Sequence, residues 1–457
     1  MHRFIIVGGG AGGLELATRL GDRFGSTDEK TPPKAQVTLV DRNPTHIWKP
    51  LLHEVAAGSM DPFTQELEYA AQALWHGFEF QQGELVGLDR AARRITIGAL
   101  RDEEAGELLP ERELEYDTLV IAIGSTTHFF GVEGAQQNSI ALDTVGQAEL
   151  FRKRLIAACM RAEHFAPEPV AAVVANGEIE SAEPVVEDAP RIQVAIVGAG
   201  ATGVELSAEL RNTAQVLSAY GLHKLHPKHD IGIVLIEAGP RILPALQERV
   251  SSATAELLTK LGVKLMTGET VAEVSKDSIR TAGGKTIRAD LTVWAAGIKA
   301  PAILSNLDGL PTNRLGQLLV RRTLQTEVDD NVFALGDCAA CPWPGNERNV
   351  PPRAQAAHQQ ASFLFKSLER LLQGKPLPEY TYRDFGSLVS LGHYSAVGNL
   401  MGGLIGGNML IEGLFARFMY MSLYRLHVAA LHGYARMVLD TVAHWLRRST
   451  APRVKLH

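Results

Sequence analysis

The stretch that decides the fold lies at the start of the chain: Arg3-Phe-Ile-Ile-Val-Gly-Gly-Gly-Ala-Gly-Gly-Leu-Glu-Leu-Ala-Thr-Arg-Leu20. Its first part, residues 4–7, is wholly apolar, which is typical of a strand buried on both faces of a parallel sheet. After residue 13, apolar side chains recur at the spacing of a helix: Leu14, Leu16, Ala17 and Leu20. Between them stand three glycines in a G-x-G-x-x-G pattern: Gly8, Gly10 and Gly13. The stretch therefore predicts a strand, a glycine turn and a helix.

Each glycine of this turn has a task in binding a dinucleotide. Gly8 permits the tight turn, Gly10 lets a pyrophosphate approach bare backbone, and Gly13 lets the helix pack closely on the strand. The helix N-terminus offers free N–H groups and a positive dipole end to the phosphates. A second apolar strand at 37–40 ends in Asp41, whose carboxylate can accept from both ribose hydroxyls of an unphosphorylated adenosine.

The same pattern returns at residues 191–210, with its glycines at Gly198, Gly200 and Gly203. Its second strand, 233–236, ends in Glu237. A carboxylate at this position repels a 2'-phosphate, so the second site should prefer NADH over NADPH, although Arg241 nearby weakens that expectation. One chain with two dinucleotide folds requires two dinucleotides, or one dinucleotide and a substrate.

Three further buried strands end where a dinucleotide could be touched. The first, 116–125, ends near Gly124; the second, 290–297, ends at Gly297; and the third, 331–339, carries Gly336 and Asp337. Ligands of parallel sheets bind at the carboxyl ends of the strands. Because the third strand follows the second glycine motif, the first fold should resume after the second has been inserted.

Composition limits the class of protein. At 457 residues with 46% hydrophobic content, the chain should form two or three globular domains. Three cysteines argue against a disulfide framework and suit a reducing compartment. The first apolar run is too short for a signal peptide. The longest stretch without charge, 385–411, holds seven glycines and should form strands and turns. No basic, aromatic-studded face predicts nucleic-acid binding, and no set of ligands predicts a metal.

Charge is distributed unevenly along the chain. Residues 413–457 carry a net charge of +6, which leaves −12 for the rest. Arg425, His432 and Arg436 fall close together on a helical wheel, with Arg417 at the edge of that stripe. The apolar residues of the segment are Leu414, Phe415, Phe418, Met419, Leu423, Leu426, Val428 and Leu431. A basic amphipathic helix is typical of a membrane interface, so we expect the tail to face anionic lipid. Packing against its own body or a dimer partner is the alternative, and both can hold together.

Residues 167–190 differ from the rest, with four prolines, six acids and no Lys or Arg. Such a segment buries too little to offset its ordering entropy, which predicts a flexible surface insertion.

Taken together, these marks resemble the two-dinucleotide-binding-domain flavoproteins and, within them, the bacterial type II NADH dehydrogenases, single-subunit NADH:quinone oxidoreductases that do not pump protons. The resemblance covers nearly the whole chain. It rests on Trp48-Lys-Pro-Leu-Leu-His-Glu-Val-Ala-Ala-Gly-Ser59, Gly200-Ala-Thr-Gly-Val-Glu-Leu-Ser-Ala-Glu-Leu210, Val293-Trp-Ala-Ala-Gly-Ile-Lys-Ala-Pro301, Pro351-Pro-Arg-Ala-Gln-Ala-Ala-His-Gln359 and Leu423-Tyr-Arg-Leu-His427. The acidic insertion is the main departure.

The resemblance implies an α/β protein with two Rossmann-like domains, the second inserted in the first, and a C-terminal amphipathic membrane-interface region. The expected divisions are 1–145 and 311–380 for the FAD-binding domain, 146–190 for the linker, 191–310 for the NADH-binding domain and 381–457 for the tail. FAD should contact Gly8, Gly10, Gly13, Asp41, Lys49, Val86, Gly124, Gly336 and Asp337. NADH should contact Gly198, Gly200, Gly203, Glu205, Glu237 and Gly297.

The implied activity is transfer of a hydride from NADH to FAD and of two electrons to a membrane quinone of the respiratory chain. Glu205, two residues past Gly203, should orient the nicotinamide or relay a proton. Gln355 and Gln359 are four apart and should share the helix face that meets the quinone, where an amide can donate to a carbonyl without adding charge. The enzyme should be peripheral on the cytoplasmic face of the bacterial inner membrane, and a homodimer is left open.

Two alternatives remain at this point. A sulfide:quinone oxidoreductase of the same superfamily needs two cysteines across the flavin, and Cys159 with Cys338 or Cys341 makes it conceivable. A membrane-bound nucleotide sensor would bind NADH without reducing a flavin. A disulfide reductase would carry an early CxxxxC, which the sequence lacks.

Overall fold

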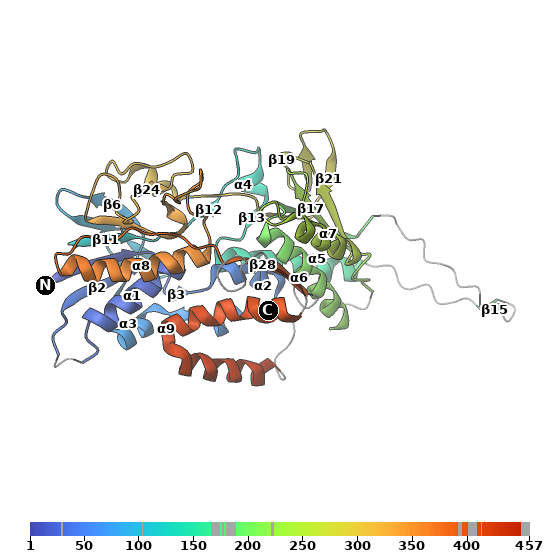
Figure 1. The fold of residues 1–457 in the computed structure, drawn as a ribbon. Coiled ribbons are helices and arrows are strands. Elements are labelled where there is room, and N and C mark those ends of the chain that lie inside the picture. Colours follow the sequence, from blue (N-terminus) through green and yellow to red (C-terminus); the bar gives the residue numbers. More distant parts are fainter. Residues whose placement is uncertain are drawn as a thin grey trace.

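Two parallel five-stranded sheets form the framework of the molecule (Figure 1). The structure, a computed structural model, describes residues 1–28, 31–102, 104–165, 174–175, 178–179, 189–220, 224–391, 395–400, 409–412 and 414–448. Each sheet begins from one of the two glycine motifs. The predicted α/β class with two Rossmann-like folds is confirmed.

The first sheet has the strand order β25-β11-β1-β2-β5, and its strands run in parallel. Its strands are β1 (His2–Val7), β2 (Ala35–Asp41), β5 (Glu79–Gln82), β11 (Thr118–Ile121) and β25 (Val332–Ala334). The helices beside it are α1 (Ala11–Phe24), α3 (Tyr69–His76) and α8 (Ala354–Leu372). In the central strand β1, the residues from Phe4 to Val7 are buried, each at most 3% exposed, as the unbroken apolar run predicts.

The second sheet repeats this plan in the order β13-β22-β16-β17-β18. Its strands are β13 (Ile140–Ala141), β16 (Ile192–Val197), β17 (Ile231–Glu237), β18 (Val263–Thr267) and β22 (Leu291–Trp294). The helices of this part are α2 (Leu52–Ala57), α5 (Val145–His164), α6 (Ala201–Ala219) and α7 (Glu248–Lys260). It occupies the right side of Figure 1, and the first sheet the left.

The sheets correct two of the expected boundaries. β13, which lies before residue 145, already pairs with β22 of the second sheet. On the return, Ala300, Leu304 and Leu310 are buried in the core of the first fold. The inserted fold therefore begins before residue 140 and ends near residue 300, because strand pairing rather than the break in apolar pattern decides where the chain crosses.

Smaller sheets cover the ends of the two large ones. β6 (Leu85–Asp89), β7 (Arg94–Ile97) and β10 (Arg112–Glu115) form an antiparallel sheet in the first fold, and β19 (Val271–Val274), β20 (Ser278–Thr281) and β21 (Thr286–Arg288) form one in the second. The remaining pairs are β3 (Thr45–His46) with β4 (Leu67–Glu68), β8 (Leu100–Asp102) with β9 (Gly106–Leu109), β12 (Thr126–Thr127) with β23 (Ile298–Lys299), and β24 (Leu318–Leu319) with β26 (Ala339–Ala340). Short helices are η1 (Lys49–Leu51), η2 (Pro62–Thr64), α4 (Ala135–Asn138), η3 (Ala302–Asn306) and η4 (Gly336–Cys338).

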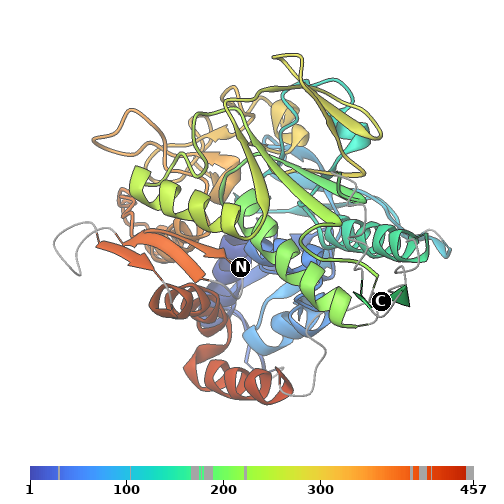
Figure 2. The same cartoon turned by 90° about the vertical axis from the view of Figure 1, so that its right-hand side faces the viewer.

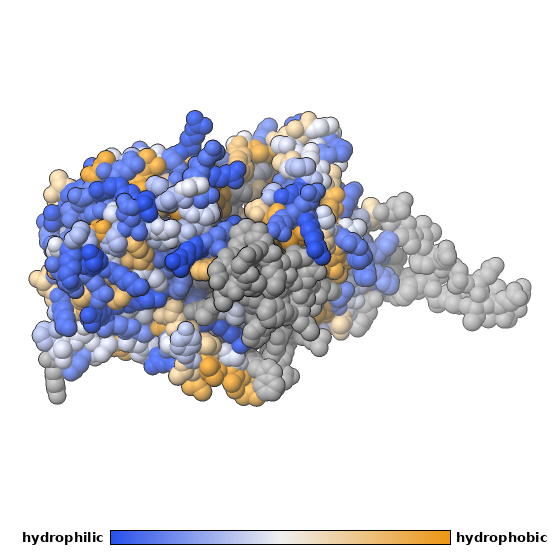
Figure 3. Space-filling view, viewed as in Figure 1, coloured by the Kyte–Doolittle hydropathy of each residue, from blue (hydrophilic) through white to orange (hydrophobic). Residues whose placement is uncertain are grey.

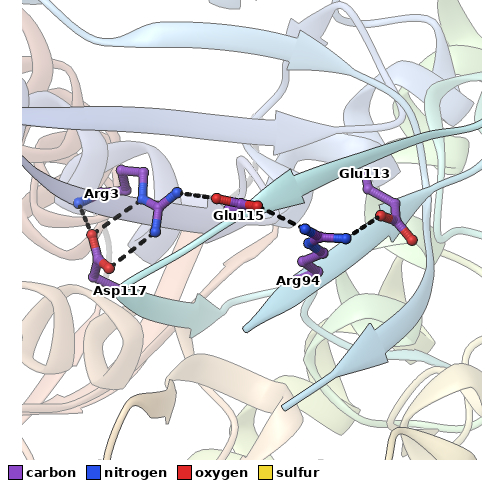
Figure 4. A network of polar contacts seen from close by, with 5 residues as sticks. All are labelled: Arg3, Arg94, Glu113, Glu115 and Asp117. Atoms are coloured by element: carbon purple, nitrogen blue, oxygen red, sulfur yellow. Dashed lines mark hydrogen bonds and ion pairs between the residues drawn. The ribbon is translucent and has the colours of Figure 1, made fainter. Parts of the chain in front are cut away.

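An ion-pair network joins the first small sheet to the central strand of the first fold (Figure 4). Arg3 of β1 contacts Glu115 at 2.5 Å and Asp117 at 3.1 Å. Glu115 also contacts Arg94 of β7 at 2.9 Å, and Arg94 reaches Glu113. These side chains are largely exposed, so each pair contributes at most about 1 kcal/mol to stability. The network therefore links β10 to β1 but adds little to the stability of the fold.

The C-terminal part forms an antiparallel sheet and a long broken helix. β27 (Gly386–Leu391), β28 (Ser395–Leu400) and β29 (Met409–Glu412) pair in that order, as predicted for the uncharged stretch. α9 (Leu414–Arg448) is interrupted at Gly433, which has φ +77° and ψ 164°. Figures 1 and 2 show its two arms as red helices at the bottom of the molecule.

The two arms of α9 differ in exposure. His427, Val428 and Leu431 of the first arm are buried against the body. The second arm exposes Tyr434, Val438, Leu439, Val442 and Leu446, each by 49% or more. Apolar side chains gather at this lower edge in Figure 3. The side chains of Leu414, Phe415, Arg417, Phe418, Met419, Leu423 and Leu426 lie outside those described, so their part of the predicted apolar and basic faces is not compared. Among the described residues, none of the helices is long and apolar enough to cross a bilayer.

Most of the acidic insertion at 167–190 also lies outside the described residues. Its described part pairs β14 (Val174–Ala175) with β15 (Glu178–Ile179) in antiparallel fashion.

Candidate functional site

The first glycine turn leaves an open space in front of a helix N-terminus. Gly8 has φ +104°, and a Cβ there would lie 2.4 Å from the carbonyl oxygen of Ala122. A Cβ at Gly13 would lie 1.8 Å from the carbonyl oxygen of Gly8. Gly10 caps α1 without a side-chain hydrogen bond, and a Cβ there would meet no atom within 4 Å. The first N–H groups of a helix have no intrahelical partner, so this space fits a phosphate group.

The second glycine turn has the same geometry. Gly198 has φ +101°, and a Cβ there would lie 2.7 Å from Ala296. A Cβ at Gly203 would lie 2.0 Å from the carbonyl oxygen of Gly198. Gly200 caps α6 without a side-chain hydrogen bond and faces open space. The structure thus contains two cradles of one design.

In each cradle, a carboxylate accepts a hydrogen bond from the backbone of the glycine turn. Asp41 Oδ2 accepts the N–H of Gly9 at 2.7 Å, and Glu237 Oε2 accepts the N–H of Ala199 at 2.8 Å. Burial raises the pKa of Asp41, and the N–H donors act in the opposite direction. Arg241 donates to the carbonyls of Leu243 and Pro244, at 3.4 and 2.9 Å. Its guanidinium is therefore held by carbonyls of its own loop.

A second group of predicted residues meets at the ends of β11 and β25. Lys49 Nζ donates to the carbonyl of Ser125 and to Asp143 Oδ1, both at 2.9 Å. Ser125 Oγ donates to Asp337 Oδ2 at 2.8 Å, and burial raises the pKa of that carboxyl. Gly124 (φ +69°) and Gly336 (φ +74°) stand beside these residues in the sequence and keep their backbone open to close approach. With the first glycine turn, these groups fit the phosphates, ribose and ribityl chain of FAD.

Two predicted contacts sit in other surroundings. Val86 lies on β6 and is 44% exposed, whereas Gln82, four residues earlier, pairs with Asp41. Gly297 has φ +68°, and a Cβ there would lie 2.3 Å from the ring of Phe130. A side chain at this position would therefore displace the ring of Phe130, whether or not NADH is bound. The assignments of Val86 to FAD and of Gly297 to NADH stay predictions.

Glu205 is buried between three segments. Its side chain on α6 is 6% exposed, and Oε1 accepts the N–H of Ser390 of β27 at 3.0 Å. Oε2 lies 3.5 Å from Nδ1 of His53 on α2. His53 Nδ1 donates to the carbonyl of Pro50 at 2.8 Å, and burial lowers the pKa of His53 to about 4. His53 is therefore neutral at pH 7, and Glu205 is held by a backbone N–H.

Sequence reasoning missed both neighbours of Glu205. His53 lies inside the quoted Trp48 motif, so its position in a motif was the available signal. Ser390 carries no signal, because only the folded chain brings residue 390 to residue 205.

Gln355 and Gln359 share one face of α8, as predicted. Gln355 Nε2 donates to the carbonyl of Gly386 at 2.9 Å, and Gln359 Nε2 donates to the carbonyl of Arg383 at 2.8 Å. Their side-chain oxygens accept the N–H groups of Phe385 and Arg383. Both amides therefore hold the segment 383–386, a partnership that the sequence did not indicate.

Strand β27 connects the two groups of predicted catalytic residues. Its first residue, Gly386, is bound by Gln355, and Ser390 of the same strand is bound by Glu205. Residues 386 and 390 point to the same side of the strand, since side chains alternate with a period of two. β27 is therefore held by Gln355 at its first residue and by Glu205 four residues later.

Another carboxylate occupies the position in α1 that Glu205 has in α6. Glu15, two residues past Gly13, is fully buried. Its Oε2 lies 2.5 Å from Nδ1 of His358, and its Oε1 accepts from Arg19 Nε at 2.9 Å. Through His358, Glu15 fastens α8 to α1. The sequence analysis did not single out Glu15 or His358.

The three cysteines do not form a redox pair across a shared site. Cys159 belongs to the core of the second fold, whereas Cys338 and Cys341 belong to the core of the first. All three are buried thiols whose pKa is raised to about 12. This arrangement does not support a sulfide:quinone oxidoreductase. In the described part of the chain, no three His, Cys, Asp or Glu residues are arranged to hold a metal ion.

The comparisons with known proteins agree with this geometry. Residues 2–361 match the family model described as pyridine nucleotide-disulphide oxidoreductase. The chain is 42% identical to a type II NADH:quinone oxidoreductase of Haemophilus influenzae over the full length of both proteins. It is 26% identical to a protein of the same name from Staphylococcus aureus (strain NCTC 8325 / PS 47), with 89% of this chain and 91% of that protein covered.

Two solved structures share the fold. NDH2 from Plasmodium falciparum in complex with NADH has a TM-score of 0.76 at 19% identity, with 96% of this chain and 97% of that chain covered. The sulfide:quinone oxidoreductase of Aquifex aeolicus has a TM-score of 0.70 at 17% identity, with 95% and 92% covered. Fold alone does not separate these two activities, and the full-length relative at 42% identity does. The chain belongs to the pyridine nucleotide-disulphide oxidoreductase family and, within it, to the type II NADH:quinone oxidoreductases.

Proposed function

We propose that this chain oxidises NADH and passes the electrons to a quinone, with FAD held in the first nucleotide fold. The observation that carries the proposal is the duplicated cradle. Both copies have an uncapped helix N-terminus at Gly10 or Gly200 and a carboxylate, Asp41 or Glu237, bound to the turn. One cradle suits a resident dinucleotide, and the other suits a dinucleotide that enters and leaves.

The first fold takes FAD because polar groups are gathered at the ends of its strands β11 and β25. Lys49, Ser125 and Asp337 form a connected group beside Gly124 and Gly336. FAD, when bound, supplies the chemistry that accepts a hydride and releases electrons singly or in pairs. The second fold takes NADH, with Gly198, Gly200 and Gly203 at the pyrophosphate and Glu237 at the adenosine ribose.

Glu205 orients the nicotinamide or holds a proton beside it. The carboxylate sits at the N-terminal end of α6, next to the turn that binds the NADH pyrophosphate. Its hydrogen bond from Ser390 fixes one oxygen, while the neutral His53 flanks the other. A buried, oriented carboxylate can hold a carboxamide or exchange a proton without moving.

Gln355 and Gln359 form the quinone side of the site. Their amides fix the segment 383–386 at the start of β27, and an amide N–H can donate to a quinone carbonyl without adding charge. The side chains act either directly, by turning to the quinone, or by shaping the segment that contacts it.

The second arm of α9 faces an anionic lipid surface, from which the quinone reaches the site. Its exposed Val438, Leu439 and Val442 supply apolar area for such a surface. The enzyme is then peripheral on the cytoplasmic face of the bacterial inner membrane and works in the respiratory chain without pumping protons. A homodimer is compatible with this arrangement.

An anaerobic stopped-flow experiment tests the proposal. NADH is added to the purified protein, and the yellow flavin colour should vanish; a quinone is then added, and the colour should return. NADPH serves as the control and should bleach the flavin far more slowly. A colourless protein that takes up no FAD would overturn the proposal, and tight binding of NADH without bleaching would indicate a nucleotide sensor instead.

A further inference from the structure

A single carbonyl in the first glycine turn is held by side chains from distant parts of the chain. The carbonyl oxygen of Gly9 accepts from Tyr69 Oη at 2.8 Å and lies 2.9 Å from Nδ1 of His46. The N–H of the same residue donates to Asp41 Oδ2. Gly9 therefore connects the pyrophosphate turn to the ribose carboxylate, and whatever fixes Gly9 fixes both.

His46 in turn depends on the C-terminal helix. Its Nε2 lies 3.0 Å from Nε2 of His427, the buried histidine in the first arm of α9. A carbonyl only accepts, so His46 Nδ1 must carry a hydrogen and, in the neutral ring, Nε2 must be the acceptor. His427 must then donate its Nε2–H. The contact between the two rings is a directed hydrogen bond in which the C-terminal helix supplies the hydrogen.

The first arm of α9 packs against the first fold, which holds His427 in place beside His46. The ring of His427 lies 4.2 Å from that of Trp48, centroid to centroid, and Leu431 is 1% exposed in the core of the first fold. Tyr424 Oη donates to Gln65 Oε1 at 2.9 Å. These contacts join the first arm of α9 to His46, Trp48 and Gln65, which follow β2 in the chain.

The second fold shows that such a distant support is not required by the turn itself. There the corresponding carbonyl, that of Ala199, accepts the backbone N–H of Leu243 at 2.8 Å. That donor comes from the same fold and needs no side chain. The dependence on α9 is thus specific to the first cradle, the one that keeps its nucleotide during turnover.

We propose that His427 is a positioning residue of the FAD site: by donating to His46, it lets the seated C-terminal helix hold the Gly9 turn in its FAD-binding form. The inference depends on the assignment of FAD to the first fold. It makes retention of FAD a property of the whole chain, because a helix beyond residue 413 completes a site that begins at residue 8.

Acid should weaken this support. Burial lowers the pKa of His46 to about 4 and holds that of His427 well below its usual value, with help from neighbouring histidines. The other ionisable groups near the pair are His358 of α8, His432 of α9, Tyr69 and Asp41. The seated state keeps both rings neutral, whereas an unseated His427 binds a proton near pH 6.5. Seating is therefore complete above pH 6.5 and is lost as the pH falls from 6.5 towards 4.

Release of FAD from the holoenzyme, followed by the rise in flavin fluorescence on dilution, tests the proposal. His427→Phe keeps a ring beside Trp48 but removes the donor, and it should release FAD on the order of tenfold faster at pH 7.5. His427→Gln restores a side-chain donor and should recover most of the loss. His432→Phe is the control on the same helix, since the described contacts of His432 are with Gln72, Trp75 and His76, and it should release FAD at the wild-type rate at pH 7.5.

The pH profile separates positioning from general damage. Wild-type release should accelerate between pH 6.5 and 4.5, and the His427→Phe variant, which has lost the titrating pair, should change much less. Equal release rates from wild type and His427→Phe, or equal acceleration by His432→Phe, would overturn the role of His427 alone. Absence of flavin from the wild-type protein would overturn the proposed function as well.

Discussion

The two nucleotide folds are close copies in their backbones and differ in what supports them. Gly8 and Gly198 have φ values of +104° and +101°, and their N–H groups donate to Val40 and Ile236 at 2.7 and 2.8 Å. The second fold closes its turn with its own backbone. The first uses the side chains of Tyr69 and His46, and His46 is in turn held by His427 of the C-terminal helix. A repeated motif thus fixes the backbone of the turn, while the groups that support the turn differ between the two folds.

The glutamates after the third glycine extend the comparison. Glu15 is bound to His358 and Arg19 and joins two helices of one fold. Glu205 is bound to Ser390 of the C-terminal sheet and flanked by His53 of α2. The same residue at the same offset is a structural fastening in one copy and a candidate for chemistry in the other.

Replacing the middle glycine of each turn by valine should have the largest effect, because each variant should lose only the nucleotide of its own fold. Gly10→Val fills the phosphate space without a clash in the protein, since a Cβ there meets nothing within 4 Å. Loss of two charge-assisted bonds at about 1.5 kcal/mol each should weaken FAD binding roughly a hundredfold. Gly200→Val should keep FAD and raise the Kd for NADH by a similar factor.

Flavin content of the purified variants and titration with NADH measure the two effects. Gly146→Ala, at another glycine with open space, is the control and should change neither. Loss of FAD from Gly200→Val would contradict the assignment of the two folds.

Replacing each of the two equivalent glutamates by glutamine should have a smaller effect, which differs in kind between the two variants. Glu205→Gln should slow flavin reduction by NADH on the order of tenfold to a hundredfold, because a hydrogen bond to a charged group contributes about 1.5–3 kcal/mol. Glu15→Gln should leave that rate unchanged and lower the free energy of unfolding by about 1–3 kcal/mol. Stopped-flow reduction and urea unfolding separate the two, and equal kinetic losses in both variants would show that position alone decides the role.

The carboxylates at the strand ends should divide the nucleotides between the folds. Glu237→Gln removes the charge that repels a 2'-phosphate, and it should raise the KM for NADH about tenfold while it improves use of NADPH. Asp41→Asn should leave the NADH-to-NADPH preference as it is and reduce FAD content. Steady-state kinetics with each nucleotide check this, and an unchanged preference in Glu237→Gln would assign selectivity elsewhere.

The smallest effect is expected at the quinone side. Gln359→Leu removes one amide with two backbone partners, so quinone turnover should fall roughly fivefold while NADH still bleaches the flavin. Gln373→Leu, at the C-terminal end of the same helix, is the control and should match the wild type. Slower bleaching by NADH in Gln359→Leu would mean that the residue acts through β27 on Glu205 rather than on the quinone.

The sequence predicted those features that depend on short spacings. The glycine turns, the strands ending in Asp41 and Glu237 and the shared face of Gln355 and Gln359 all lie within about 45 residues of the motif that defines them. Local periodicity and backbone sterics determine such features, so a single sequence carries them.

Features that depend on distant pairing were missed or misplaced. Ser390 beside Glu205 and His427 beside His46 join residues 185 and 381 positions apart, and no local pattern encodes such contacts. The boundary at 145 failed for the same reason, because the short strand β13 is assigned to the second sheet only by its pairing with β22. The partners of Gln355 and Gln359 could not be predicted either, because residues 383–386 contain no sequence motif that indicates a contact with this helix.

The place of β25 at the edge of the first sheet sets an order of events on the ribosome. All the main strands of the second fold are synthesised before residue 332: β16, β17, β18 and β22. The first sheet, in contrast, is complete only after β25 and the helix α8 beside it have been synthesised. Domains fold largely as units during synthesis. The fold that comes second in the sequence can therefore be completed first, and the sheet of the first fold is completed only in a chain that already has the second.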